Sequence, residues 1–190
     1  MLWPLVLPAK ITFWLLLVVL IVSTIAVQRY YKKGMRALTI GTGICILLFI
    51  PCCIGVQTII DPYRFGVFTY PDFLSVKDFR VERYLPDTAT NITIDKYPEG
   101  FCAKFSISKQ NLDEFFERQW SERGKEAKNP RESPKPNDEL EFVNRQIASL
   151  GWKAPDGSIG YRGPRASNGA GFTLMYNEPE GIAYELAGYW

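Results

Sequence analysis

Two arginines in a glycine-rich stretch are the side chains of this sequence best suited to hold an anion. Arg162 and Arg165 lie in RGPRASNGAG, at 162–171. Runs of backbone N–H groups in turns bind anions, and guanidinium groups pair with carboxylate and phosphate oxygens. The stretch lacks the Gly-Lys-Ser/Thr ending and the strand–loop–helix context of a phosphate-binding loop. We therefore expect a hairpin loop in which Arg162 and Arg165 are candidate anion or ligand contacts.

Cys102 is the only cysteine in the C-terminal two thirds of the chain, and Lys104 follows it by two residues. A nearby cation favours the thiolate, which is the nucleophilic form of cysteine. However, the chain has no histidine, so neither a Cys-His pair nor a Ser-His-Asp triad can form on it. We therefore expect Cys102 to be a packed structural thiol on the polar side of its strand.

Two groups of carboxylates could supply a general acid and a general base. Asp95 and Glu99 lie beside a predicted turn, whereas Asp113, Glu114 and Glu117 lie in one predicted helix. Acid–base catalysis needs carboxyl groups at a defined separation with different pKa values, and neither pattern defines that separation. Acidic side chains near a helix N-terminus are also favoured by the helix dipole alone. The sequence therefore predicts no catalytic residue, no cofactor and no metal site.

Alternation of apolar and polar residues predicts the strands that surround these side chains. Segments 90–97 and 101–107 alternate on either side of a short turn and predict a β-hairpin with one apolar face. Segments 171–176 and 182–189 predict a second strand pair around NEPEG. A further short extended stretch is predicted at 79–85, before a proline.

Helical spacing of apolar residues predicts two amphipathic helices between the strand pairs. Ser108 is a suitable N-cap for the first, which ends near Gly124. Asp138 is a suitable N-cap for the second, with Glu141 as its capping-box partner. Strands, then helices, then strands favour a small α+β domain. We expect an antiparallel sheet with the two helices on one face.

The first 60 residues have the composition of a membrane region. Segments 11–27 and 37–60 carry no charged side chain and consist mostly of apolar residues. The bilayer core needs about 20 helical residues, within a range of about 17–25. A soluble helix of this length would show a polar face, which neither segment has. We therefore predict two transmembrane helices at 11–27 and 37–60.

Charge is distributed unevenly along the chain. Of its 22 basic residues five precede Asp61 and 17 follow it, whereas all 20 acidic residues lie at or after Asp61. Most of the early basic residues lie in the loop 28–36, and short basic loops stay in the cytoplasm; Lys10 alone favours the opposite orientation. We expect a multi-pass protein of the cell (inner) membrane. Its domain at 78–190 would lie outside the cytoplasm, after a connecting segment at 61–77.

The cysteines of the apolar region allow a second interpretation of it. The stretch from Met35 to Cys53 resembles a lipoprotein signal in which Cys52 or Cys53 would be lipidated. Such a signal places a small residue directly before the cysteine, whereas Pro51 precedes Cys52 here. Whether either cysteine is lipidated is left open, since both also suit an apolar helix as small hydrophobic side chains.

One segment resembles small, uncharacterised bacterial membrane-anchored envelope proteins. It reads YLPDTATNITI…GFCAKFSISKQNLDEFF and runs from 84 to 116. It combines a Leu-Pro step, an alanine close to Asn-Ile, and a strand that leads through Ile-Ser into an amphipathic helix. The resemblance implies a tail of further strands and a place in the cell envelope, and it implies no activity.

Together these features predict an integral membrane protein that displays an extracytoplasmic α+β domain for interaction, sensing or envelope assembly, without catalysis. Its expected partners are the lipid bilayer and other membrane or envelope proteins. Basic and acidic residues alternate in the domain, so no nucleic-acid partner is expected. Two alternatives stay open. One is a membrane-anchored enzyme that uses carboxylate or Arg residues, and the other is a subunit of a membrane complex with the second span as its interface.

Overall fold

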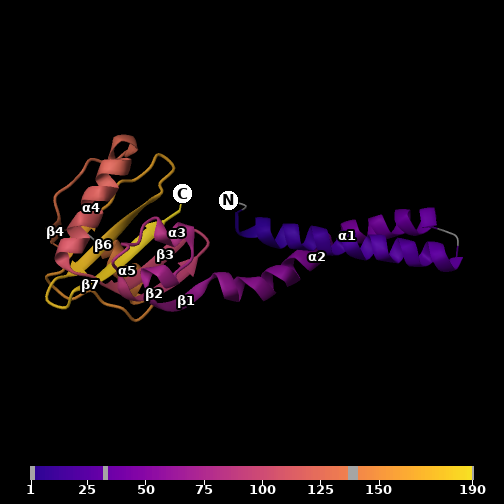
Figure 1. Ribbon diagram of the computed structural model, residues 1–190, viewed down its shortest axis with the longest axis horizontal. Helices are drawn as coiled ribbons and strands as arrows, with labels where there is room; N and C mark the ends of the chain where they lie inside the picture. Colours follow the sequence, from indigo (N-terminus) through magenta and orange to yellow (C-terminus); the bar gives the residue numbers. More distant parts are fainter. Residues whose placement is uncertain (1–2, 32–33, 137–140, 190) are drawn as a thin grey trace. The chain divides into compact units, whose positions relative to one another are not determined.

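The computed structural model describes residues 3–31, 34–136 and 141–189 of the chain. The chain divides into two compact units, Met1–Arg64 and Phe65–Trp190. The first consists of two long helices and the second contains the β-sheet (Figure 1). The second unit begins well before the domain start predicted at 78, because the segment ahead of that position joins the sheet.

The first unit is an antiparallel helical hairpin of α1, Trp3–Tyr31, and α2, Gly34–Arg64. Both helices are longer than the predicted spans, since the helical conformation continues through the charged residues at their ends. Arg64 Nη1, at the end of α2, donates a hydrogen bond to the Pro4 carbonyl oxygen, near the start of α1, at 3.1 Å. The hairpin therefore brings the start of α1 and the end of α2 to the same side.

The surface of this hairpin is apolar over most of its length. Trp14 and Leu47 are 63% and 78% exposed, and no described residue of α2 is buried. The core helices of a soluble protein bury such side chains. Both helices are long and apolar enough to cross a membrane. With 29 residues, α1 is about 43 Å long, which matches a bilayer of about 40–45 Å including headgroups.

The second unit is built on a seven-stranded antiparallel sheet in the order β1-β2-β3-β7-β6-β5-β4. The two predicted strand pairs are confirmed as the hairpins β2–β3 and β6–β7, and β7 lies beside β3 at the centre of the sheet. The strands are β1 (Gly66–Asp72), β2 (Thr90–Tyr97), β3 (Gly100–Ser106), β4 (Lys135–Pro136), β5 (Ile159–Arg162), β6 (Gly171–Asn177) and β7 (Ile182–Gly188).

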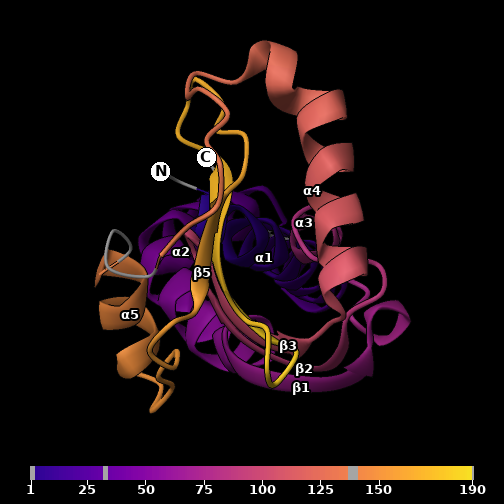
Figure 2. The same ribbon diagram turned by 90° about the vertical axis from the view of Figure 1, so that its left-hand side faces the viewer.

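The two longer helices of this unit lie on opposite faces of the sheet (Figure 2). α4, Lys109–Arg123, packs its buried Phe116 into one apolar cluster, and α5, Glu141–Ala148, packs Ile147 into the other. The prediction of both helices on one face is therefore wrong. Successive side chains of a strand point to opposite faces, and the strands carry apolar residues on both, such as Met175 on the α5 side. A helix therefore has to cover each face to shield its apolar side chains from water.

The segment 79–85, predicted as extended, instead contains the short helix α3, Phe79–Glu82. The Asp78 carboxylate accepts a hydrogen bond from a backbone N–H at the start of α3, at 3.2 Å, and so caps it. The segment 61–77, predicted as a connection, contains the last turn of α2, strand β1 and the 3-10 helix η1, Phe73–Ser75. This part of the chain therefore belongs to the folded structure.

The described part of the charged loop between α4 and α5 contains two short elements. The 3-10 helix η2, Gly124–Glu126, follows α4 directly, and β4 pairs with β5 at the edge of the sheet. The predicted N-cap Asp138 and the side chain of its partner Glu141 lie outside the described residues, as do Lys32 and Lys33 of the basic loop.

Candidate functional site

The candidate contact Arg162 is the last residue of β5, and Arg165 lies in the loop between β5 and β6, close to the segment that follows α4. The segment after α4 holds this loop in place. The Lys128 N–H donates to the Arg165 carbonyl oxygen at 2.8 Å. Asn129 donates to the Gly163 carbonyl oxygen at 3.1 Å and accepts from the Arg165 N–H at 2.7 Å. The loop and the end of α4 therefore form one surface.

Two hollows of this surface share Arg165. The larger has a volume of about 380 Å³ and is also lined by Arg162, whereas the smaller has a volume of about 50 Å³ and is also lined by Arg83 and Arg123. These four arginines are here called the arginine site. The lining includes one carboxylate for each hollow, Glu132 in the larger and Glu126 in the smaller. Positive charge therefore exceeds negative charge, most clearly in the smaller hollow.

Arg83 and Arg123 are held against the same aromatic ring. Their guanidinium carbons lie 5.6 Å and 5.3 Å from the centroid of the Tyr84 ring, within the range of a cation–π contact. Tyr84 is itself buried and packs on Phe172 at a centroid distance of 5.9 Å. Burial, and next to it the positive charge of Arg83, lower the pKa of the Arg123 guanidinium. An anion in the smaller hollow would relieve this repulsion.

Arg162 forms an ion pair with a carboxylate of the larger hollow, Glu132. Its Nη1 is 3.6 Å from Glu132 Oε2, and its side chain is 41% exposed. Glu132 is also 3.6 Å from the Lys135 ammonium. Exposed ion pairs of this kind are weak, so Glu132 could be displaced by a stronger anionic ligand.

The glycines of the loop allow close packing against Phe172 and tight turns of the backbone. A Cβ on Gly163 would lie 2.2 Å from the Phe172 ring, so only glycine allows the loop to approach that ring. The Gly163 N–H donates to the Phe172 carbonyl oxygen at 3.0 Å, and the Ala166 N–H donates to that of Ala170 at 2.8 Å. These backbone N–H groups are therefore already used within the protein. An anion would therefore be bound here by the guanidinium groups and not by backbone N–H groups.

Cys102 lies on the face of the sheet that α5 covers, and the predicted polar side of its strand is therefore incorrect. The side chain is buried. Burial, followed by the negative charge of Asp95, raises the pKa of its thiol to about 11. At neutral pH the thiol is protonated, which suits the packing role predicted for it.

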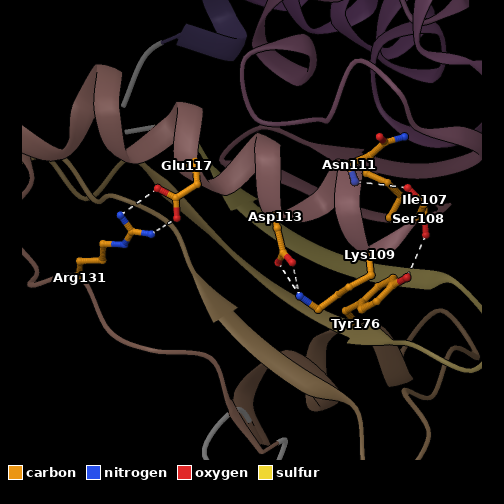
Figure 3. Close-up of polar contacts among 8 residues, drawn as sticks. All are labelled: Ile107, Ser108, Lys109, Asn111, Asp113, Glu117, Arg131 and Tyr176. Carbon is orange, nitrogen blue, oxygen red and sulfur yellow. Dashed lines mark hydrogen bonds and ion pairs between the residues drawn. The ribbon is translucent and has the colours of Figure 1, made fainter.

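The predicted acidic residues of α4 each contact a different neighbour, as Figure 3 shows for Asp113 and Glu117. On α4, Asp113 pairs with Lys109, and Glu117 pairs with Arg131, which lowers the pKa of Glu117. Glu114 accepts a hydrogen bond from a glutamine on the same helix at 3.0 Å. Each carboxylate therefore has its own partner along the helix surface. Elsewhere, burial alone raises the pKa of Asp95.

The sequence pattern missed Arg83 and Arg123. Arg123 is the last residue of α4, where a basic side chain is favoured by the helix dipole alone, and Arg83 lies in a stretch predicted as extended. Among the described residues, no group of three His, Cys, Asp or Glu side chains is placed to hold a metal ion. No family model, curated protein or solved structure matches the chain. The resemblance to envelope proteins stays a prediction.

Proposed function

We propose that this chain is an integral membrane protein that displays its α+β domain outside the cytoplasm and binds an anionic ligand there, without catalysis. The helical hairpin would cross the cell membrane twice, with the basic loop 28–36 in the cytoplasm. The domain would act in interaction, sensing or envelope assembly. The ligand would carry a phosphate, sulfate or carboxylate group and bind at the arginine site.

Membrane insertion is supported by the surface of the hairpin. Its large apolar side chains point outward, and water would have to solvate them if no lipid surrounded them. The loop between the helices is basic and free of acidic residues, which favours its retention in the cytoplasm. The antiparallel hairpin then leaves the end of α2, and the domain that follows it, on the other side.

Ligand binding is supported above all by one observation, the convergence of Arg83, Arg123 and Arg165 on the smaller hollow. Bringing guanidinium groups together is unfavourable unless an opposite charge compensates them. The lining carboxylate Glu126 supplies one negative charge against three positive charges. Guanidinium groups bind oxyanions through charge-assisted, often bidentate hydrogen bonds. An anion therefore fits the site better than a neutral ligand does.

An enzyme that uses the same arginines is the first alternative. It is favoured by the two lining carboxylates, Glu126 and Glu132, which could take part in proton transfer. The two belong to different hollows, however, and acid–base catalysis needs both groups beside one substrate. Binding without catalysis agrees better with this geometry.

A subunit of a membrane complex is the second alternative. It is favoured by an apolar groove of about 390 Å³ between α1 and α2. Small residues of α2 lie against α1 here: the Cys45 thiol is 3.8 Å from the Leu16 carbonyl oxygen, and a Cβ on Gly41 would lie 2.7 Å from Leu20. Crosslinking through Cys45, Cys52 or Cys53 in the membrane would support this role, and a purely monomeric species in mild detergent would count against it.

The topology is tested by adding protease to spheroplasts that contain the full chain. We expect the domain to be digested from outside and the hairpin to stay with the membrane. Protection of the domain until the membrane is lysed would show the opposite orientation. Recovery of the full chain in the supernatant after ultracentrifugation, without detergent, would refute membrane insertion.

Anion binding is tested by titrating pyrophosphate into the full chain in detergent micelles, followed by calorimetry. Arg123→Gln is the test variant and Arg118→Gln the matched control, since Arg118 lies on the same helix but pairs with Asp87 outside the hollows. A hydrogen bond to a charged group contributes about 1.5–3 kcal/mol, so Arg123→Gln should weaken binding about tenfold or more. Equal affinities for both variants, or no binding by the parent chain, would refute the proposed site.

A further inference from the structure

The first residue of α3 exposes a large aromatic side chain. Phe79 is 78% exposed, although α3 is otherwise anchored in the core by Val81, which is fully buried. The basic residues Lys77 and Arg80 flank it in the sequence, and Lys77 is exposed. The Arg80 guanidinium carbon lies 5.9 Å from the centroid of the Phe79 ring. An exposed aromatic ring beside basic side chains is the composition of a surface that contacts a lipid headgroup layer.

The position of Phe79 is set by ion pairs on either side of it. The Asp78 carboxylate receives hydrogen bonds from Arg80 Nε at 3.2 Å and from Lys96 Nζ at 3.1 Å. Arg80 also lies over the ring of Tyr189, at 5.3 Å from its centroid. These contacts hold the start of α3 against the sheet, so the exposure of Phe79 is imposed by the fold.

The same contacts place Phe79 at one particular end of the sheet. Lys96, which pairs with Asp78, is the register partner of Gly66, the first residue of β1. Tyr189 donates its N–H to the Glu99 carbonyl oxygen, in the turn between β2 and β3, at 3.0 Å. The start of β1 and the turn after β2 therefore lie at the same end as α3, which is here called the proximal end.

The proximal end is also the end through which the chain leaves the second span. α2 ends at Arg64 and β1 begins at Gly66, so a single residue joins them. One helical turn separates the end of the apolar segment, Ile60, from Arg64. Gly66 can therefore lie at most about 13 Å beyond Ile60 along the chain. This distance corresponds to the headgroup layer and the water next to it.

We propose that the proximal end of the α+β domain rests on the surface of the bilayer that the hairpin spans, with Phe79 inserted at the boundary between headgroups and acyl chains. Arg80 and Lys77 then lie at the level of the lipid phosphates. This contact holds the domain in one orientation over the membrane. It rests on the membrane insertion of the hairpin proposed above, and it is independent of anion binding at the arginine site.

Leu74 provides a matched control. It is 81% exposed, and it follows Asp72, which pairs with Thr90 at the opposite end of β1. Both positions are exposed apolar residues that a tryptophan can replace without entering the core. Only Phe79 lies at the proximal end, whereas Leu74 follows the opposite end of β1.

The test compares Phe79→Trp with Leu74→Trp in the full chain, reconstituted in nanodiscs. Half of the samples contain lipids brominated near the top of the acyl chains, which quench tryptophan at short range. The emission of the parent chain is subtracted from that of each variant. The parent emission includes Trp14 of α1, so its quenching tests the membrane insertion of the hairpin. We expect the added emission at position 79 to fall by more than half in the brominated lipid, and that at position 74 to stay unchanged.

The outcomes separate the two proposals. Quenched parent emission with no extra quenching at position 79 would overturn docking and leave the membrane insertion of the hairpin intact. Equal quenching at positions 79 and 74 would also overturn the assignment to the proximal end. Parent emission that is not quenched would refute membrane insertion and docking together. Unquenched but blue-shifted emission at position 79 would assign Phe79 to a protein partner and overturn docking to lipid.

Discussion

Glu185 is a carboxyl group in the centre of the sheet without a polar partner among the described residues. It is fully buried on β7, between Ala103 of β3 and Leu174 of β6. Neither carboxyl oxygen has a hydrogen-bond partner in the described part of the chain. Burial raises the pKa of this carboxyl well above its ordinary value. We therefore predict that Glu185 makes the stability of the domain depend on pH.

The direction of this dependence follows from proton linkage. In the unfolded chain the pKa of a glutamate is about 4.3, whereas in the folded domain it is raised. The folded state thus retains a proton that the unfolded chain releases. The contribution of Glu185 to stability is fully present below about pH 4.3 and is lost as the pH rises through the folded-state pKa. In that window the free energy of unfolding falls by about 1.4 kcal/mol per pH unit.

Two substitutions of Glu185 separate its charge from its polarity. Glu185→Gln removes the ionisation but keeps a polar group, so its stability should be close to that of the parent at about pH 4 and higher at pH 7. Its advantage at pH 7 should be about 1.4 kcal/mol for each pH unit between 4.3 and the folded-state pKa, or between 4.3 and 7 where the folded-state pKa lies above 7. Glu185→Leu also removes the unsatisfied polar group, and it should be more stable than Glu185→Gln by about 1–3 kcal/mol at every pH.

The measurement must report on the domain alone. Urea titrations of the full chain in micelles, from about pH 4 to about pH 8, are each followed by a deuterium pulse at one fixed pH. Mass spectrometry of the β3 and β7 peptides then gives the unfolded fraction of the domain. Glu114→Gln, at an exposed position of α4, is the control and should follow the parent. A parent stability that does not vary with pH, or a Glu185→Gln variant less stable than the parent at pH 7, would refute the reasoning.

Three further predictions concern the core and the loop of the arginine site. Cys102 should react with iodoacetamide far more slowly in the native chain than after denaturation, since burial raises its pKa to about 11; equal rates, measured by mass spectrometry, would contradict this. Gly163→Ala should lower the melting temperature of the domain, because its Cβ would lie 2.2 Å from the Phe172 ring and overpacking costs about 1–3 kcal/mol. An unchanged melting temperature, measured by calorimetry, would contradict this. Asn129→Ala should weaken pyrophosphate binding although all four arginines remain, since it removes the two hydrogen bonds that position the loop; unchanged affinity would show that these bonds are not needed.

Local pattern was sufficient for several elements of the fold. The alternation at 90–97 and 101–107 corresponds to β2 and β3, and Ser108 caps α4 through a hydrogen bond from the Asn111 N–H at 3.2 Å. These features depend on residues a few positions apart. The segment 79–85 was not predictable in the same way, because a single cap at Asp78 outweighs a weak alternation.

By itself, the sequence determined that two apolar segments precede an α+β domain, since length, charge and periodicity are properties of the chain alone. Only the tertiary structure decided that α5 covers the face opposite α4, because apolar residues on both sides of a strand do not say which helix packs on which side. It also decided the arginine site: Arg83, Arg123 and Arg165 are far apart along the chain, and the packing of three separate segments brings them to one hollow.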